Sequence, residues 1–235
     1  MKVLAIGCHP DDMEICCAGT LAKYVKLGHE VTVCHCCNGN MGHVVIQPDE
    51  LRVIRINEAK KAGAMAGIKV RTIDVGDLVI YHQDKETRDK LVELIREEHP
   101  DVIITHAPND YMPDHIAVSN LVFDAAFAAT CAHYANPNGL PAAECVPIYY
   151  MDNLAGMNFV PTIYVDITDT IELKLQMLEC HESQLKWMRD HDNIDFADLV
   201  RTSSRYRGYQ CGCAYAEGFT ECGAYLKMGT KRLLP

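Results

Sequence analysis

Short apolar runs alternate with longer amphipathic segments through the first half of the chain. This order predicts strands at Lys2–Gly7, Glu30–Cys36, Val70–Ile73 and Asp101–Thr105, with helices at Glu14–Leu27, Pro48–Met65, Lys85–Glu98 and Val118–Ala132. Strands separated by helices pair in parallel through right-handed crossovers, and the helices then cover both faces of the sheet. We therefore expect an α/β fold, a Rossmann-like three-layer sandwich with a mostly parallel sheet.

The pattern changes after Tyr134, where several prolines and a glycine predict a loop. Beyond it we expect strands at Val146–Tyr150 and Thr162–Val165, and helices at Thr168–Gln184 and Asp195–Tyr206. No internal repeat, low-complexity tract or linker interrupts the sequence, and 235 residues can bury one sizeable core. The prediction is a single domain spanning residues 1–235.

The charge balance excludes some classes of partner. The net charge is −10 and no basic run is present, which argues against nucleic acid or an anionic membrane surface. No apolar run reaches the roughly 18 residues that a membrane span needs. The apolar run near the N-terminus lacks the features of a signal peptide, so we predict a cytoplasmic protein with a small-molecule partner.

Twelve cysteines occur in the chain, and most of them interrupt apolar runs. In a chain of this length without an export signal, we interpret them as small buried hydrophobic residues rather than a disulfide framework. The segment Cys34–Cys37 comes nearest to metal-binding spacing. Alternate side chains of a strand face opposite ways, however, which argues against a metal site there.

The segment Cys8–Asp12 places one imidazole and two carboxylates directly after the first predicted strand. Adjacent carboxylates repel each other, and a buried charge needs a partner or a metal ion. His9 and Asp12 are therefore candidate ligands of a divalent cation, which leaves Asp11 free to act as a general base. The alternative is structural, since Asp11 or Asp12 could cap the following helix.

A second cluster, Thr105–His115, follows the fourth predicted strand. Ligands of open α/β sheets bind at the carboxyl ends of the strands, so we expect both clusters to face one crevice. His115 would complete a set of two histidines and one aspartate that leaves coordination positions open, as a catalytic zinc site requires. Asp110 and Asp114 are candidates to orient an imidazole, although Asp114 could instead cap the helix that follows.

Three further segments extend the pattern. They are Arg55–Glu58 with Ala59 and Ala62, Lys174 with His181–Gln184, and Arg207-Gly208 with Tyr215–Phe219. Together with the two clusters, and with Gly19–Ala22 behind the first, these segments resemble the PIG-L/LmbE-like family of zinc-dependent N-acetylglucosaminyl deacetylases. That family includes enzymes of bacillithiol and mycothiol synthesis. The resemblance runs from about residue 2 to residue 221.

The resemblance implies a role for each matching residue. His9, Asp12 and His115 would bind one zinc ion per chain, and Asp11 would be the general base. Arg55 would contact the substrate or the developing oxyanion. In the same way we place Asp114 with the catalytic residues, and His106 and Asp110 with Arg55 at the substrate.

The implied reaction is removal of an acetyl group from an N-acetylated amino sugar or sugar conjugate. The alternatives are an amidase for another small amide, and a weakly active or non-catalytic member that binds metal or carbohydrate. A nucleotide site in the glycine-rich loop Asn38–Gly42 is disfavoured because no phosphate-binding motif is present; the loop could approach a sugar or be an ordinary turn. The family also implies a homo-oligomer, a trimer or a hexamer.

One position departs from the family pattern. Many members have a histidine three residues before the second metal histidine, and this chain has Met112 there. Methionine can neither stabilise an oxyanion nor donate a proton. Either His106, Tyr111 or His181 substitutes, or Asp11 serves as both base and acid, or the methionine meets an apolar part of a different substrate. Substrate specificity is expected in three segments: Asn38–Gln47, Tyr134–Cys145 and Asn153–Pro161.

Overall fold

The computed structural model describes residues 1–235 and contains one sheet of seven strands in the order β3-β2-β1-β4-β5-β7-β6. The strands are β1 (Lys2–Gly7), β2 (Glu30–Cys37), β3 (Lys69–Val75), β4 (Val102–His106), β5 (Ile148–Met151), β6 (Ile163–Asp166) and β7 (Ala216–Glu221). The strands β1 to β5 pair in parallel, whereas β7 lies antiparallel between β5 and β6. The predicted mostly parallel α/β sheet is confirmed.

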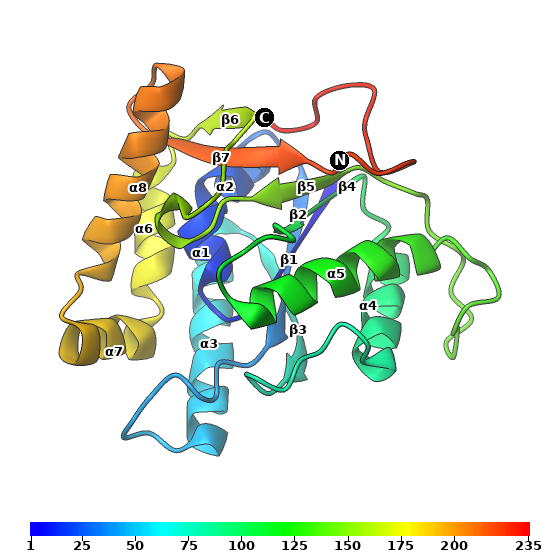
Figure 1. Cartoon of the computed structure of the whole chain (residues 1–235), viewed down its shortest axis with the longest axis horizontal. Helices are drawn as coiled ribbons and strands as arrows, with labels where there is room; N and C mark the ends of the chain where they lie inside the picture. The colour runs from blue at the N-terminus through cyan, green and yellow to red at the C-terminus, as the bar shows by residue number, and fades with distance from the viewer.

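Helices cover both faces of the sheet (Figure 1). On one face lie α1 (Asp12–Cys16), α2 (Ala18–Lys26), α3 (Pro48–Ala66), α6 (Ile171–Glu179) and α8 (Phe196–Cys211), and on the other lie α4 (Lys85–Glu98) and α5 (Pro113–Ala128). The helix α7 (Glu182–Asp192) and a 3-10 turn (Leu154–Gly156) extend the first of these layers. The expected three-layer sandwich is therefore present.

The central strand shows why the sheet is apolar on both sides. Val3 and Ala5 of β1 join the core under the α1–α3 layer, while Leu4 and Ile6 join the core under α4 and α5. Successive side chains of a strand point to opposite faces, so a strand covered on both faces becomes a continuous apolar run. Burying each large aliphatic side chain contributes about 1.5–3 kcal/mol.

Several element boundaries differ from the sequence prediction. The helix expected at 14–27 divides at Cys17, whose φ is −148°, and the helix expected at 168–184 divides into α6 and α7 around Cys180 and His181. The helix α5 begins at Pro113, well before Val118. Strand β7 was not predicted, because Glu217 and Gly218 interrupt the alternation of apolar residues in it.

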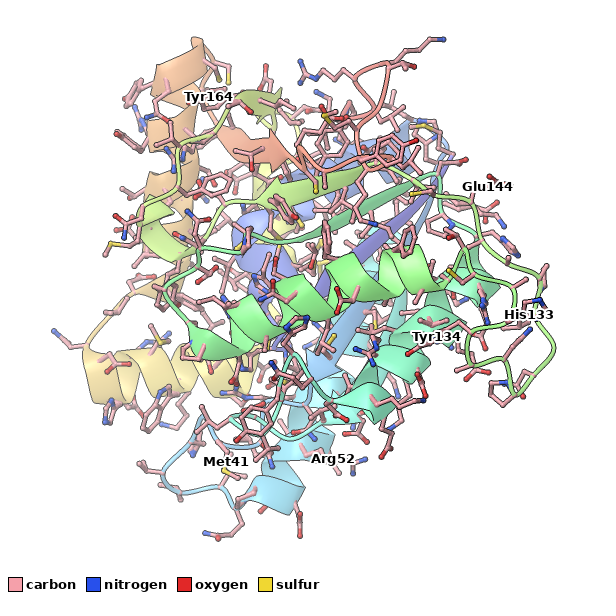
Figure 2. The ribbon with its side chains drawn as sticks, turned by 45° about the vertical axis from the view of Figure 1, so that its right-hand side comes forward. Met41, Arg52, His133, Tyr134, Glu144 and Tyr164 are labelled. Carbon is pink, nitrogen blue, oxygen red and sulfur yellow. The ribbon has the colours of Figure 1, made fainter.

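The long connection between α5 and β5 lies away from the carboxyl ends of β1 and β2. Figure 2 shows Tyr134 and Glu144 on this connection and Met41 on the β2–α3 loop at the other side of the molecule. The Tyr134 hydroxyl donates to Asp89 at 2.9 Å and accepts from Arg88 at 3.0 Å, which ties the connection to α4. No helix combines the length and the apolar composition needed to cross a membrane.

Candidate metal centre and active site

Strand β1 and the start of α5 bring His9, Asp12 and His115 together. Their ligand atoms all lie within 4.8 Å of one another. His115 Nε2 is 3.3 Å from Asp12 Oδ1, and His9 Nδ1 is 3.7 Å from Asp12 Oδ2. His115 Nε2 is buried without a hydrogen-bond partner. Two imidazoles and one carboxylate with their ligand atoms this close together suit a divalent cation, zinc in particular.

The backbone fixes one oxygen of Asp12 and leaves the other facing His115. Asp12 Oδ2 accepts the backbone N–H of His9 at 2.6 Å and of Cys8 at 3.1 Å. Burial opposes ionisation of Asp12, but His115 and His106 outweigh it and hold the pKa of this carboxyl well below its usual range. Asp12 is therefore a preorganised carboxylate, with Oδ1 available as a ligand.

Two further carboxylates contact the outer nitrogens of the histidines. Asp110 Oδ2 lies 3.2 Å from His115 Nδ1, and Asp114 Oδ2 lies 3.2 Å from His9 Nε2. The same Asp114 oxygen accepts the backbone N–H of Leu78 at 2.9 Å, and Asp114 makes no capping hydrogen bond to α5. Carboxylates in this position fix the orientation of a ligating imidazole and raise its basicity.

His106 lies behind the candidate ligands rather than in the cavity. Its side chain is fully buried, its Nε2 accepts the backbone N–H of Cys8 at 3.0 Å, and its ring stacks on His115 at 4.0 Å between centroids. Burial, helped by the nearby His115, lowers the pKa of His106 to about 4, so the ring is neutral. The side chain of Asp110 is only 1% exposed. Neither His106 nor Asp110, both predicted at the substrate, lines the cavity.

Asp11 borders the cavity in an uncommon backbone conformation. Its φ is +121°, a region that non-glycine residues rarely adopt, and strain of this kind concentrates at functional sites. Asp11 occupies the position before α1 but makes no side-chain capping hydrogen bond, so the capping alternative is wrong for this residue. Burial, together with the charge of Asp12, raises the pKa of Asp11 to about 7.

The glycine-rich loop after β2 holds Arg55. The guanidinium Nη2 donates to Gly42 O at 3.0 Å and to Gln184 Oε1, and the side chain lies in the cavity wall. A Cβ on Gly39 would lie 2.4 Å from Arg55 Cδ, and a Cβ on Gly42 would lie 2.9 Å from the guanidinium nitrogens. The loop therefore needs glycine at both positions to let this arginine pass.

These groups surround a cavity of about 310 Å³, a size typical of small-molecule sites. Met41 and Leu154 come from two of the segments in which substrate specificity was expected, Asn38–Gln47 and Asn153–Pro161. Sequence reasoning missed other lining residues: Ile15, Asp77, Leu78, Met188 and Phe196. Asp77 accepts the backbone N–H groups of Gly39 at 2.9 Å and Met41 at 3.0 Å. Its position just after β3, at the carboxyl edge of the sheet, was a signal that could have identified it.

Met112 also lines this cavity. Of the three side chains proposed to replace the missing histidine, Tyr111 lines the cavity, and His106 and His181 do not. Tyr111 lines the cavity and lies edge-on to His115, with ring centroids 5.9 Å apart. His181 is 1% exposed and lies 3.3 Å from Glu14 Oε2, outside the cavity wall. No residue of the predicted specificity segment Tyr134–Cys145 reaches the cavity.

Lys174 and Glu217, from the last two segments that resemble the family, form a buried structural contact. Glu217 Oε1 pairs with Lys174 Nζ at 2.7 Å, and the Glu217 carboxylate accepts the backbone N–H groups of Gly19 and Thr20 at the start of α2. All these groups are buried. Glu217 therefore holds the start of α2 against α6 through a buried ion pair within the chain.

An α/β sandwich that places two histidines, an aspartate and an uncommitted second aspartate at one strand edge has the architecture of a metal-dependent hydrolase. Comparison with known proteins makes this specific. Residues 4–126 match the family described as PIG-L, GlcNAc-PI de-N-acetylase. The chain belongs to the PIG-L family, as its motifs indicated.

Two curated relatives and two solved structures illustrate the similarity. The diacetylchitobiose deacetylase of Thermococcus kodakarensis is 30% identical, with 92% of this chain and 81% of that protein covered. A probable N-acetyl-alpha-D-glucosaminyl L-malate deacetylase 2 of Bacillus anthracis is 27% identical, with 77% and 80% covered. The structure of N,N'-diacetylchitobiose deacetylase from Pyrococcus horikoshii, complexed with its inhibitor, matches with a TM-score of 0.81, 27% identity, and 94% and 83% coverage. GalB, the 4-carboxy-2-hydroxymuconate hydratase of Pseudomonas putida, also matches with a TM-score of 0.81 and 99% coverage of both chains, but at 21% identity it shares the fold alone.

Proposed function

We propose that this protein is a metal-dependent N-deacetylase that removes the acetyl group from an N-acetylated amino sugar or sugar conjugate. The observation that carries the proposal is the open set of His9, Asp12 and His115, with Asp11 uncommitted beside it in the same cavity. The printed names of the relatives, deacetylases of acetylated amino sugars, support the substrate class.

His9, Asp12 and His115 would hold the metal ion, which we propose to be one zinc ion per chain, as the donor set suggests. When bound, such a cation polarises the acyl carbonyl and lowers the pKa of a water molecule. The protein keeps the ligands in place through two contacts, Asp114 to His9 and Asp110 to His115. We therefore reassign Asp114 from catalysis to positioning, and we give the same role to Asp110.

Asp11 is the group that moves the proton. Its carboxylate takes a proton from the attacking water and delivers it to the leaving amine nitrogen. In the metal-free site the pKa of this carboxyl is raised to about 7 by burial and by the charge of Asp12, so the protein itself makes Asp11 a stronger base than an exposed aspartate. Asp11 makes no side-chain capping hydrogen bond to α1, so its carboxylate is not tied to the start of that helix.

Arg55 and Tyr111 are the proposed contacts to the reacting amide and the sugar. The Arg55 guanidinium is anchored through Nη2, while its Nε is buried without a partner. Burial raises the pKa of the Tyr111 hydroxyl, so this hydroxyl stays protonated and can donate a hydrogen bond to a developing oxyanion. Tyr111 is thus the proposed substitute for the histidine that Met112 replaces.

An amidase for a less polar amide is the second candidate. Ile15, Leu154 and Phe196 form one wall of the cavity, and Met112 adds another apolar side chain. These side chains favour a substrate with an apolar group next to its acetylated nitrogen. A cytoplasmic location and assembly into trimers or hexamers stay predictions from the sequence and the family resemblance.

The test is amine release from a panel of acetylated substrates by zinc-loaded protein. The panel holds N-acetylglucosamine, diacetylchitobiose, glycosides of N-acetylglucosamine and acetylated aryl amines. We expect Asp11→Asn to retain about one zinc per chain and to lose hydrolysis, while Asp169→Asn, at an exposed position, retains both. Full activity in Asp11→Asn, or zinc content near zero in the wild type, would contradict the proposal.

A further inference from the structure

The two ring nitrogens of His9 face different groups. His9 Nδ1 lies 3.7 Å from Asp12 Oδ2 in the candidate catalytic set. His9 Nε2 lies 3.6 Å from Cys8 Sγ and 3.2 Å from Asp114 Oδ2. Cys8 Sγ in turn lies 3.5 Å from Cys37 Sγ. A second group of four donors, containing two thiols, therefore adjoins the first group at His9.

Neighbouring strands bring the two thiols together. Cys8 follows β1, Cys37 ends β2, and the Cys37 N–H donates to the carbonyl oxygen of Cys8 at 2.8 Å. The pairing of β2 with β3 shifts register between His35 and Cys37, which marks a bulge at this end of the strand. Alternation along β2 points its own neighbouring cysteines to opposite faces. The second thiol of this group comes instead from the end of the neighbouring strand, β1.

Three of the six distances between these donors match the edges of a tetrahedral metal site. Zinc–ligand bonds of ordinary length imply edges of about 3.8 Å between two sulfurs, about 3.6 Å between sulfur and imidazole nitrogen, and about 3.3 Å between nitrogen and carboxylate oxygen. The corresponding distances are 3.5 Å, 3.6 Å and 3.2 Å. All four ligand atoms lie within 4.8 Å of one another.

We propose that Cys8, His9, Cys37 and Asp114 form a second metal site, the thiol site, for a thiophilic dication such as Zn²⁺ or Cd²⁺. Two thiolates select soft metals over Mg²⁺ or Ca²⁺. The Leu78 N–H, which donates to Asp114 at 2.9 Å, holds the carboxylate in place. Both thiols are buried, so the metal enters from the cavity past His9 and displaces two thiol protons. When the first site is also filled, His9 binds through both ring nitrogens as imidazolate, and its ring proton is released as a third.

The thiol site shares His9 with the candidate catalytic set, which has a consequence for activity. A cation in the thiol site takes Asp114 away from its orienting contact and pulls the His9 ring towards the cysteines. Excess thiophilic metal should therefore inhibit hydrolysis, at concentrations above those that fill the first site. This consequence rests on the proposed function, whereas metal binding by the four side chains does not.

Titration of metal-free, reduced protein with Co²⁺ tests the site directly. We expect two equivalents to bind, the second with a sulfur-to-cobalt charge-transfer band in the near ultraviolet. Cys37→Ala should lose the band and the second equivalent but keep the first. Cys36→Ala is the matched control, because Cys36 is equally buried on the same strand and lies outside the donor set. It should keep the band.

A wild-type chain that binds Co²⁺ without the band would overturn the proposal, and so would a band that survives in Cys37→Ala. Should Cys37→Ala misfold, cadmium NMR of the unaltered chain decides, because sulfur ligands shift the cadmium resonance far from that of a purely nitrogen and oxygen site. Failure of the proposed deacetylation would leave these spectra unchanged, so the two hypotheses fail separately.

Discussion

Glu58 on α3 accepts two hydrogen bonds from Ser183 at the start of α7, from its backbone N–H at 2.8 Å and from its hydroxyl at 2.6 Å. One residue further along α7, Gln184 accepts from Arg55. The two family segments that contain these residues are far apart in sequence but form one joint. That joint holds the middle of α3, where Arg55 lines the cavity.

Glu58→Ala should therefore weaken both stability and substrate binding. The substitution leaves two donors of Ser183 without partners, which costs about 1–3 kcal/mol, and it loosens the anchor of Arg55. The free energy of unfolding from urea titration and KM for the best substrate measure the two effects. The control is Glu182→Ala, since Glu182 is exposed and pairs only with Lys61 at the surface, where loss should cost less than about 1 kcal/mol. Equal effects of the two substitutions on the free energy of unfolding and on KM would show that Glu58 does not anchor Arg55 through α7.

Removing the metal should abolish hydrolysis and lower the melting temperature, because a cation that binds only the folded state stabilises it by mass action. Chelation followed by zinc addition measures both. His115→Ala should bind no zinc in the first site. Asp110→Asn keeps all three ligands and should weaken zinc affinity by about 10–100-fold, the usual effect of losing a carboxylate that orients a histidine. Unchanged affinity in Asp110→Asn would show that this contact does not tune the site.

Tyr111→Phe should lower kcat by about 10–100-fold, because it removes the proposed oxyanion donor and leaves the ring in place. Adding Met112→His to this variant should restore part of the loss, since the family histidine then supplies the missing donor. Tyr81→Phe is the control on an exposed tyrosine and should have no effect. A wild-type kcat in Tyr111→Phe would show that Tyr111 is not the oxyanion donor.

The sequence predicted the parallel half of the sheet because short apolar segments alternate with amphipathic helices, and because the central strands β1 and β4, covered on both faces, are nearly continuous apolar runs. It missed β7, where pairing with β5 and β6 stabilises a strand whose own residues, Glu217 and Gly218, favour no strand. The metal set was predictable because His9, Asp12 and His115 follow strand ends. Sequence spacing cannot distinguish a ring that lines the cavity from one that lies behind the candidate ligands, as His106 does. Asp77 and Cys37 acquire their neighbours only through contacts between strands and loops.

The pH dependence of kcat/KM should show an acidic limb that reports Asp11. The base must be ionised, so the rate falls as the pH drops through its pKa. Burial and Asp12 raise this pKa to about 7 in the metal-free site, and a bound dication lowers it again by favouring the carboxylate. We therefore expect a midpoint at or below about 7 for the zinc-loaded enzyme, with activity lost on the acidic side. A rate that stays constant well into the acidic range would contradict the assignment of Asp11 as base.

Gly39 and Gly139 separate backbone strain from collision with Arg55. Both have positive φ, +77° and +65°, but a Cβ on Gly39 meets Arg55 Cδ at 2.4 Å, whereas a Cβ on Gly139 meets nothing within 4 Å. Each alanine substitution should cost about 1–2 kcal/mol of stability from the strained backbone alone. Gly39→Ala should in addition displace Arg55 and lower kcat/KM by at least about tenfold, while Gly139→Ala leaves it unchanged. Because the strain is matched, a similar kcat/KM in the two variants would mean that the position of Arg55 does not limit the reaction.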